Sequence, residues 1–347
     1  MVYKIAVIGA TGLVGREMLS VLSERNFPAS EVVPLATQRS VGVKVGYGNK
    51  KLSVLATEDY DFNDIDICMM SAGSATSKVW CPRLCQLGCT VIDNSSAWRY
   101  HNDIPLVVAE VNADSISAYA NKNIIANPNC SVIQLVVALK PLHELARIKR
   151  VIVSSYQSAS GIGQKGIDTL YTQAQEVLSR SYPFKKETQQ TNKQLAFNVV
   201  PHIDVFTEDG YTREEWKIKV ETQKILNDHS IKIAATAARV PVFIGHAEAI
   251  NVEFADPITD KEAREILRKA PGCQVLDNRE EPNCYITPYE AAGKDKVYIS
   301  RIREDTSTKN GLVMWVVADN LKKGAALNAI QTAEILVNKK LISPKAA

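Results

Sequence analysis

The sequence lacks the features that mark a membrane protein or a nucleic-acid-binding protein. No run reaches the roughly 18 apolar residues that a membrane-spanning helix needs. The net charge is only +3 over 347 residues, and no basic cluster is interleaved with aromatic side chains. The N-terminus enters an apolar strand at once, so we expect neither a signal peptide nor a transit peptide. We therefore expect a cytoplasmic protein whose partners are small molecules, with no nucleic acid and no membrane.

Cysteine is present, but it is not arranged as a disulfide framework. The seven cysteines are an odd number and include no CxxC pair, which favours a reducing compartment. We interpret Cys81, Cys85 and Cys89 as packing residues of a helix and a strand. No tight cluster of His, Cys and carboxylate residues predicts a metal site. The length and the 46% hydrophobic content are sufficient for two domains.

Cys130 is the most informative residue of the chain. It lies in Asn-Pro-Asn-Cys-Ser, directly before an apolar run at residues 132–139 that predicts a buried helix. A thiol at a helix start lies beside unpaired N–H groups and the positive end of the helix dipole, which both favour the nucleophilic thiolate. The alternative is that Cys130 packs as a small apolar side chain, as free cysteines often do.

The N-terminal strand, at residues 3–8, leads into a glycine-rich turn and then a helix pattern to about residue 24. This context is typical of a dinucleotide site. Gly9 allows the tight turn, Gly12 lets the backbone approach a pyrophosphate, and Gly15 lets the helix pack closely on the strand. The pyrophosphate would lie at the helix N-terminus. The predicted cofactor loop consists of Gly9, Thr11, Gly12, Leu13, Val14 and Gly15.

The next strand, at residues 31–36, ends in a loop that contains Arg39 and Ser40. An NAD site usually has an acidic residue near this point. An arginine with a hydroxyl neighbour suits a 2′-phosphate instead. The sequence therefore favours NADP over NAD, unless Arg39 is only a solvated loop residue.

The strand pattern predicts an α/β fold. Strands at residues 65–70, 90–93 and 123–126 end in polar loops, which should meet at the carboxyl edge of a parallel sheet. The glycine loop, the Arg99 loop and Cys130 are therefore expected to converge.

From about residue 151 the pattern changes to that of an open, mixed sheet with a helix at about residues 212–227, while a last helix at residues 324–331 returns to the nucleotide domain. We predict a Rossmann-type doubly wound domain at residues 1–130, completed by about 320–347. A second, α+β domain would span residues 131–319. We expect residues 179–193 to form an exposed excursion and assign them no role.

Several ordered motifs resemble the bacterial aspartate-β-semialdehyde dehydrogenase family, and the resemblance covers nearly the whole chain. They lie at residues 9–15, 93–99, 127–131, 196–204, 239–246 and 318–326. The resemblance implies reversible, NADP-dependent conversion of aspartyl-β-phosphate to aspartate semialdehyde and phosphate, through an acyl thioester on a cysteine. This reaction belongs to lysine, threonine and methionine biosynthesis. The resemblance also implies that residues 131–319 form a catalytic and dimerisation domain, and that the protein is a homodimer or a dimer-based tetramer.

The resemblance assigns roles to individual residues. Cys130 matches the nucleophile, His246 the acid/base in a loop after Pro241, and Gln157 an amide that orients the substrate. Arg239 matches the ligand of the substrate α-carboxylate, and Glu214 that of the amino group. Arg99 and Lys217 match the phosphate pocket. Ser160, Gly161 and Asn320 match the positions that line the cofactor.

Three alternatives remain at this stage. The N-acetyl-γ-glutamyl-phosphate reductases share the glycine loop and the cysteine logic, but their cysteine context differs. A thiol acyltransferase or hydrolase could use Cys130 and His246, with the glycine loop merely structural. A catalytically silent nucleotide-binding regulator would have no reason to keep both residues.

Overall fold

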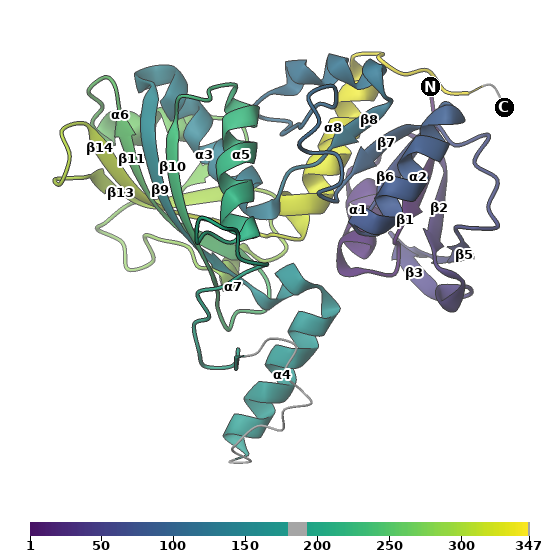
Figure 1. Ribbon diagram of the computed structural model, residues 1–347, viewed down its shortest axis with the longest axis horizontal. Helices are drawn as coiled ribbons and strands as arrows, with labels where there is room; N and C mark the ends of the chain where they lie inside the picture. The colour runs from purple at the N-terminus through teal and green to yellow at the C-terminus, as the bar shows by residue number, and fades with distance from the viewer. Residues whose placement is uncertain (180–192, 346–347) are drawn as a thin grey trace. The chain divides into compact units, whose positions relative to one another are not determined.

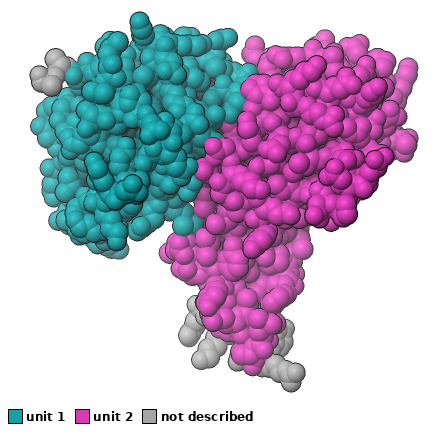
Figure 2. Space-filling view, turned by 180° about the vertical axis from the view of Figure 1, so that it is seen from behind, with its two compact units in different colours: residues 1–129, 325–347 teal, residues 130–324 magenta. Residues whose placement is uncertain are grey.

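The computed structural model describes residues 1–179 and 193–345. They form two compact units, coloured in Figure 2: Met1–Asn129 with Ala325–Ala347, and Cys130–Gly324. The excursion expected at residues 179–193 lies, apart from its two end residues, outside the described residues. Among the described residues, no helix combines the length and the apolar character that crossing a membrane requires.

Short, mostly buried apolar strands build a parallel sheet in the first unit. The order is β5-β2-β1-β6-β7-β8, and every neighbouring pair is parallel. This is the strand order of a dinucleotide-binding fold. The strands are β1 (Tyr3–Ile8), β2 (Ala29–Ala36), β5 (Leu55–Ala56), β6 (Ile67–Met70), β7 (Thr90–Asp93) and β8 (Ile124–Ala126). The prediction of a Rossmann-type domain is confirmed.

Helices α1 (Leu13–Glu24) and α8 (Asn328–Asn338) share one hydrophobic core with β1 of this sheet. Helix α2 (Ser74–Gln86) packs against β7, and β3 (Lys44–Tyr47) pairs with β4 (Lys50–Ser53) as a hairpin. Two 3-10 segments complete the unit, η1 (Gln38–Ser40) and η2 (Ala113–Asn121).

The two chain segments that lead out of the first unit and back into it are bonded to each other. Asn127 Oδ1 accepts a 2.6 Å hydrogen bond from Asn328 Nδ2, and Asn127 Nδ2 donates to the Ala325 carbonyl at 3.4 Å. Asn328 is fully buried, so this amide pair fixes the start of α8 beside the end of β8.

The second unit contains the expected open, mixed sheet. Its order is β10-β9-β11-β14-β13-β12, with parallel pairs only at its two edges. The strands are β9 (Ile148–Gln157), β10 (Lys232–Arg239), β11 (His246–Phe254), β12 (Cys273–Val275), β13 (Val297–Glu304) and β14 (Gly311–Ala318).

Helices α3 (Cys130–Ala146), α5 (Arg213–Leu226) and α6 (Asp260–Lys269) pack together with this sheet, and α3 contacts four of its strands. Helix α4 (Gln164–Leu178) extends away from the sheet (Figure 1), after the 3-10 turn η3 (Ala159–Ile162). Helix α7 (Pro288–Ala291) is a single turn beside β14.

The last predicted helix differs from expectation at its start. The segment Lys322–Leu327 is a π-helix, η5, and α8 begins only at Asn328. The cause is Asp319, whose carboxylate accepts 2.8 Å hydrogen bonds from the backbone N–H groups of Leu321 and Lys322. Its carbonyl accepts from Gly324 N–H at 2.9 Å. That i to i+5 bond is the π-helical one, and π segments occur frequently at functional sites.

Candidate active site

Cys130 is the first residue of α3, as the sequence predicts, and is partly exposed. It differs in this from Cys68, Cys81 and Cys89, which are buried. Burial raises the pKa of those thiols, that of Cys81 to about 12, and keeps them neutral. All seven cysteines are free. Cys85 and Cys284 are also partly exposed, but of these three thiols Cys130 is the one at a helix start, which suits it to react.

Gly324 packs directly against Cys130. A Cβ atom added to Gly324 would lie 2.9 Å from Cys130 Cβ and 3.3 Å from its Cα. The π-helical turn thus uses a glycine where any larger residue would push the thiol-bearing residue away.

His246 faces this thiol. Its Nε2 lies 3.3 Å from Cys130 Sγ. His246 is the first residue of β11 rather than a loop residue, so the strand pairing to β14 fixes its backbone. The Ser158 backbone N–H donates to His246 Nδ1 at 3.1 Å. Because a backbone N–H can only donate, Nδ1 is the acceptor and the ring proton is on Nε2, directed at the sulfur.

The ordinary histidine pKa near 6.5 does not hold at this site. Complete burial, together with the nearby Arg239 cation, lowers the pKa of His246 to about 3. The imidazole is therefore neutral at physiological pH. In this state it stabilises negative charge on sulfur by donating the Nε2 hydrogen bond.

Arg239 ends β10 and is 7% exposed. Its Nη1 donates to the Ser158 carbonyl at 2.8 Å, and Cys130 is close enough to favour its charge. Gly161 leaves room for this side chain, since a Cβ there would lie 2.6 Å from Arg239 Nη1. The guanidinium and the thiol therefore belong to one polar cluster.

Gln157 and Glu214 extend the cluster. Gln157 Nε2 donates to Glu214 Oε1 at 3.1 Å and to Ser155 Oγ at 3.3 Å. Lys217 Nζ lies 3.2 Å from Glu214 Oε2 and 2.7 Å from Asp204 Oδ2. Glu214 is only 5% exposed, so this i,i+3 pair is not the solvated surface pair that such spacing usually indicates.

The start of α5 fixes Glu214 and Lys217. Thr212 and Glu215 form a capping box, in which Glu215 Oε2 accepts from Thr212 N–H at 2.7 Å. The other oxygen, Oε1, accepts from Ala237 N–H of β10 at 2.9 Å. One carboxylate thus ties the first turn of α5 to the strand that carries Arg239.

Asn320 and Ser160 are bonded within the second unit. Asn320 Oδ1 accepts from Ser160 Oγ at 3.0 Å, from Ser158 Oγ at 3.1 Å and from Gly245 N–H at 2.9 Å. Ser158 Oγ also lies 3.1 Å from His246 Nδ1. The amide therefore orders the backbone on both sides of the histidine.

The glycine loop of the first unit has the geometry that an anion site needs. Gly9 has φ +86°, and a Cβ there would lie 2.6 Å from the Ser71 carbonyl oxygen. A Cβ on Gly15 would lie 2.2 Å from the Gly9 carbonyl oxygen. Both positions exclude a side chain. Gly12 is the N-cap of α1 and provides no side-chain cap, so the first N–H groups of the helix are left for a ligand.

The Arg39 and Arg99 loops follow other strands of this sheet. Arg39 and Ser40 lie in η1 directly after β2, and Arg39 is exposed. Arg99 is buried, and its Nη2 donates to the Asn94 carbonyl at 2.8 Å. Buried Asp93 organises this loop by accepting from Ser95 Oγ at 2.6 Å. The glycine, Arg39 and Arg99 loops thus all follow carboxyl ends of strands in one sheet.

Sequence reasoning missed three residues of the second unit: Ser158, Glu215 and Asp204. Ser158 stands in the small-residue loop after the strand, and Glu215 completes a Thr-x-x-Glu capping box that is visible in the sequence. Asp204 lies 13 positions from Lys217, so no local pattern could pair them. Within residues 1–179 and 193–345, no group of three or more His, Cys, Asp or Glu side chains could hold a metal ion.

Family models match most of the chain. Residues 4–119 match a family model described as the semialdehyde dehydrogenase NAD binding domain, and residues 139–323 match the semialdehyde dehydrogenase dimerisation domain. Aspartate-semialdehyde dehydrogenase of Aquifex aeolicus is 50% identical over 346 residues, which cover 99% of this chain and 100% of the relative.

The chain belongs to the aspartate-semialdehyde dehydrogenase family. Solved structures of the family share its fold. Aspartate-semialdehyde dehydrogenase II of Vibrio cholerae, also solved as a complex with ASA, is 45% identical with a TM-score of 0.93, and 97% of this chain and 99% of that chain are covered. The Candida albicans enzyme with NADP is 25% identical with a TM-score of 0.74, over 99% of this chain and 100% of that chain.

Proposed function

We propose that the protein is an NADP-dependent aspartate-semialdehyde dehydrogenase, which converts L-aspartyl-4-phosphate to aspartate semialdehyde and phosphate, reversibly. The observation that carries the proposal is the partly exposed Cys130 thiol, 3.3 Å from a neutral His246 ring and beside the buried Arg239. A nucleophile, a hydrogen-bond donor for it and a cation for a carboxylate substrate are then present in one cluster.

Different residues of the protein would act in different steps of the reaction. The Cys130 sulfur attacks the acyl phosphate, phosphate leaves, and a thioester remains on the chain. His246 Nε2–H stabilises charge on sulfur before the attack and when sulfur is finally expelled. Bound NADPH would supply the hydride that reduces the thioester.

We assign the substrate's anionic and cationic groups to separate residues. Arg239 would bind the α-carboxylate in bidentate fashion, and Glu214 would accept the amino group. Gln157, already bonded to Glu214, would orient the acyl group. Arg99 and Lys217 would bind the phosphate. Lys217 is shared with two carboxylates in the ligand-free chain, so phosphate would compete with them for it.

We assign the cofactor to the glycine loop of the first unit. Gly9, Thr11, Gly12, Leu13, Val14 and Gly15 would hold the pyrophosphate at the start of α1, and Arg39 with Ser40 would hold the 2′-phosphate. Ser160, Gly161 and Asn320 are assigned to positions that line the cofactor.

The test is phosphate-dependent reduction of NADP by aspartate semialdehyde, followed at the nicotinamide absorbance. Cys130→Ala should lower kcat at least about a hundredfold, while NADP binding measured by calorimetry stays unchanged. A thiol hydrolase or acyltransferase would give no phosphate-dependent reduction. Retained turnover in Cys130→Ala would remove the nucleophile assignment.

The cofactor assignment is tested separately. Arg39→Ala should weaken NADP by an amount that corresponds to a charged hydrogen bond, about 1.5–3 kcal/mol, and should leave NAD unaffected. Arg16→Ala is a matched control, because Arg16 is also exposed near the loop but is bonded to the Thr11 carbonyl. Equal losses for NADP and NAD would exclude a 2′-phosphate contact.

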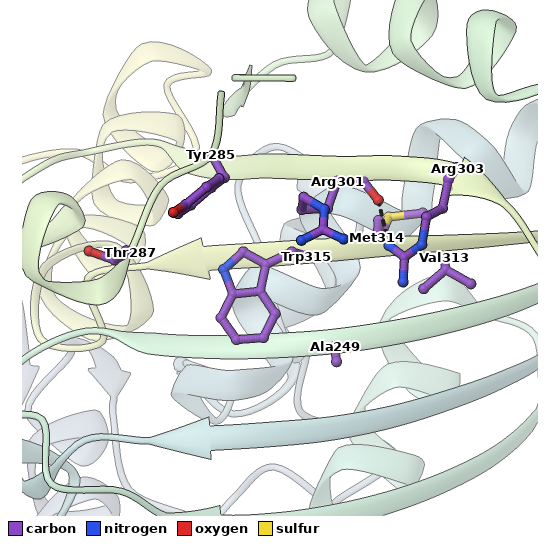
Figure 3. A pocket seen from close by; sticks show the side chains of 8 residues that line it. All are labelled: Ala249, Tyr285, Thr287, Arg301, Arg303, Val313, Met314 and Trp315. Atoms are coloured by element: carbon purple, nitrogen blue, oxygen red, sulfur yellow. Dashed lines mark hydrogen bonds between the residues drawn. The ribbon is translucent and has the colours of Figure 1, made fainter. Parts of the chain in front are cut away.

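We further propose that the protein is a homodimer, or a tetramer built from dimers, that associates through the second unit. The match to a dimerisation domain supports this. So does the sheet face that points away from α3, where a hollow of about 310 Å³ is lined by aromatic and basic side chains (Figure 3). Tyr285 on this face is 49% exposed. Apolar area of this kind is typical of a contact with a second copy.

Sedimentation velocity tests the assembly. Val313→Asp places a charge in the hollow and should shift the protein toward monomer, whereas Val79→Asp, at an exposed position of α2 in the first unit, should not. An unchanged dimer in Val313→Asp would place the contact elsewhere. We also propose a cytoplasmic location, which the seven free cysteines support and cell fractionation would test.

A further inference from the structure

The inner face of the second sheet carries a carboxyl group that the proposed reaction does not use. Glu248 lies on β11 two residues after His246 and is fully buried. Even-numbered positions of this strand are buried, whereas 249, 251 and 253 are partly exposed. His246 and Glu248 therefore point to the same face. Their neighbours across the strands include Ser155 and Val316, which are uncharged.

Gln134 of α3 is the polar neighbour of Glu248. It is 1% exposed, and its amide interacts with the carboxyl group. No polar atom of either side chain has an aligned hydrogen bond of normal length to another described residue. Burial raises the pKa of Glu248 well above its ordinary value, so the group is a neutral acid. The interaction between the two side chains is therefore available to compensate for the burial of both.

Gln134 and Glu248 are placed in the same way as Cys130 and His246, because each pair has one residue on α3 and one on β11. Cys130 and Gln134 are four residues apart on α3 and share a face of the helix. His246 and Glu248 are two residues apart on β11 and share a face of the strand. The 3.3 Å separation of Sγ and Nε2 therefore depends on how α3 is spaced and aligned along β11.

We propose that Glu248 and Gln134 are positioning residues that set the spacing and alignment of α3 on β11, and through them the contact between Cys130 and His246. Apolar packing alone is non-directional, and most side chains that α3 buries are apolar. Two other polar contacts of α3 with the sheet, Cys273 Sγ to the Val137 carbonyl and Ile148 N–H to His143 Nδ1, lie further along the helix from Cys130. A polar pair is favourable only in a few relative positions of its two groups, so it favours one alignment of the helix and strand that carry them. The proposal rests on the roles assigned above to Cys130 and His246.

The test compares variants of this pair. Glu248→Gln stays neutral and polar, and should keep kcat within about threefold of wild type. Glu248→Leu should lower kcat at least about tenfold and leave the KM for aspartate semialdehyde unchanged, because neither residue contacts substrate. Val252→Ala is the control. It removes buried apolar volume from the same face of β11, four residues beyond Glu248, and should lower the melting temperature without changing kcat.

A double variant separates positioning from stability. The double variant Gln134→Leu with Glu248→Leu removes both polar groups, so neither is left buried without a partner. Its melting temperature should return to the wild-type value, while kcat stays at least about tenfold below that of wild type. It also serves if Glu248→Leu alone does not fold. Recovery of kcat together with stability, or a loss in Glu248→Gln as large as in Glu248→Leu, would overturn the proposal.

The rate of Cys130 alkylation by iodoacetamide at pH 7, read on the Cys130 peptide, gives a second readout that requires no turnover. It should fall in Glu248→Leu and in the double variant, and stay at the wild-type rate in Glu248→Gln and Val252→Ala. An unchanged rate in Glu248→Leu would also overturn the proposal. Failure of the proposed function is recognised independently, since it would show as turnover in Cys130→Ala.

Discussion

Substitution of Gly324 by alanine tests whether the π-helical turn positions the nucleophile. The added Cβ would lie 2.9 Å from Cys130 Cβ, whereas ordinary contacts of this kind begin at 3.4 Å. Cys130 or the turn must therefore move by about 0.5 Å. A misplacement of about 1 Å can cost a hundredfold in rate, so we expect kcat to fall roughly tenfold. Overpacking should also cost about 1–3 kcal/mol of stability.

Gly46→Ala is a matched control, because a Cβ there meets nothing within 4 Å. Steady-state kinetics and urea unfolding on both variants give the measurement. Gly46→Ala should retain wild-type kcat. A Gly324→Ala enzyme with wild-type kcat and lowered stability would show that the turn yields and that Gly324 does not set the position of the thiol.

Three further predictions follow from buried groups in the second unit. Because burial raises the pKa of Glu248 above the ordinary 4.5, the native state keeps a proton that the unfolded chain releases, and wild-type stability falls as pH rises above about 4.5. Glu248→Gln should therefore gain stability over wild type by up to about 1.4 kcal/mol per pH unit in that range, and a pH-independent difference in urea unfolding would contradict a neutral Glu248. Glu215→Ala should cost about 2–4 kcal/mol, since two buried N–H groups lose their acceptor, whereas Glu262→Ala in the exposed capping box of α6 should cost about 1 kcal/mol. Arg239→Lys should raise the KM for aspartate semialdehyde more than that for phosphate, with Lys217→Ala showing the reverse, and equal changes in both constants would refute separate pockets.

The sequence predicts those parts of the fold that depend on local pattern. Five strands of the parallel sheet, all except β5, have a short apolar run that predicts them. Pro128 and the long apolar segment after Cys130 likewise predict the start of α3. The capping box at Thr212 likewise fixes the start of α5 by nearest-neighbour chemistry.

Other features depend on contacts between distant residues and could not be predicted in this way. The placement of His246 on a strand follows from its pairing with β14, across 72 positions of sequence. Its low pKa requires complete burial and Arg239, neither of which a local motif specifies. The π-helical turn is caused by Asp319, whose carboxylate also accepts from Gly293 N–H at 2.6 Å. The Glu248–Gln134 pair joins two elements by tertiary packing alone.

The topology of the chain has a consequence for the order of folding. Residues 130–324 are inserted into the first unit, which is closed by the bonds between Asn127 and the start of α8. Closing so long a loop costs entropy that grows as the logarithm of its length. In the second unit, however, the first and last residues, Cys130 and Gly324, are already in contact.

If the inserted unit folds first, the first unit needs to close only a short gap. We therefore expect α8 to dock late, after β9 and β11 have paired. Pulsed hydrogen exchange during refolding should show protection of the α8 amides after those of β11, and earlier protection of α8 would contradict this order. Cys130, the proposed nucleophile, would then also be the residue at which the two ends of the inserted unit meet. The nucleotide-binding unit would be completed only after Cys130 has reached its final position.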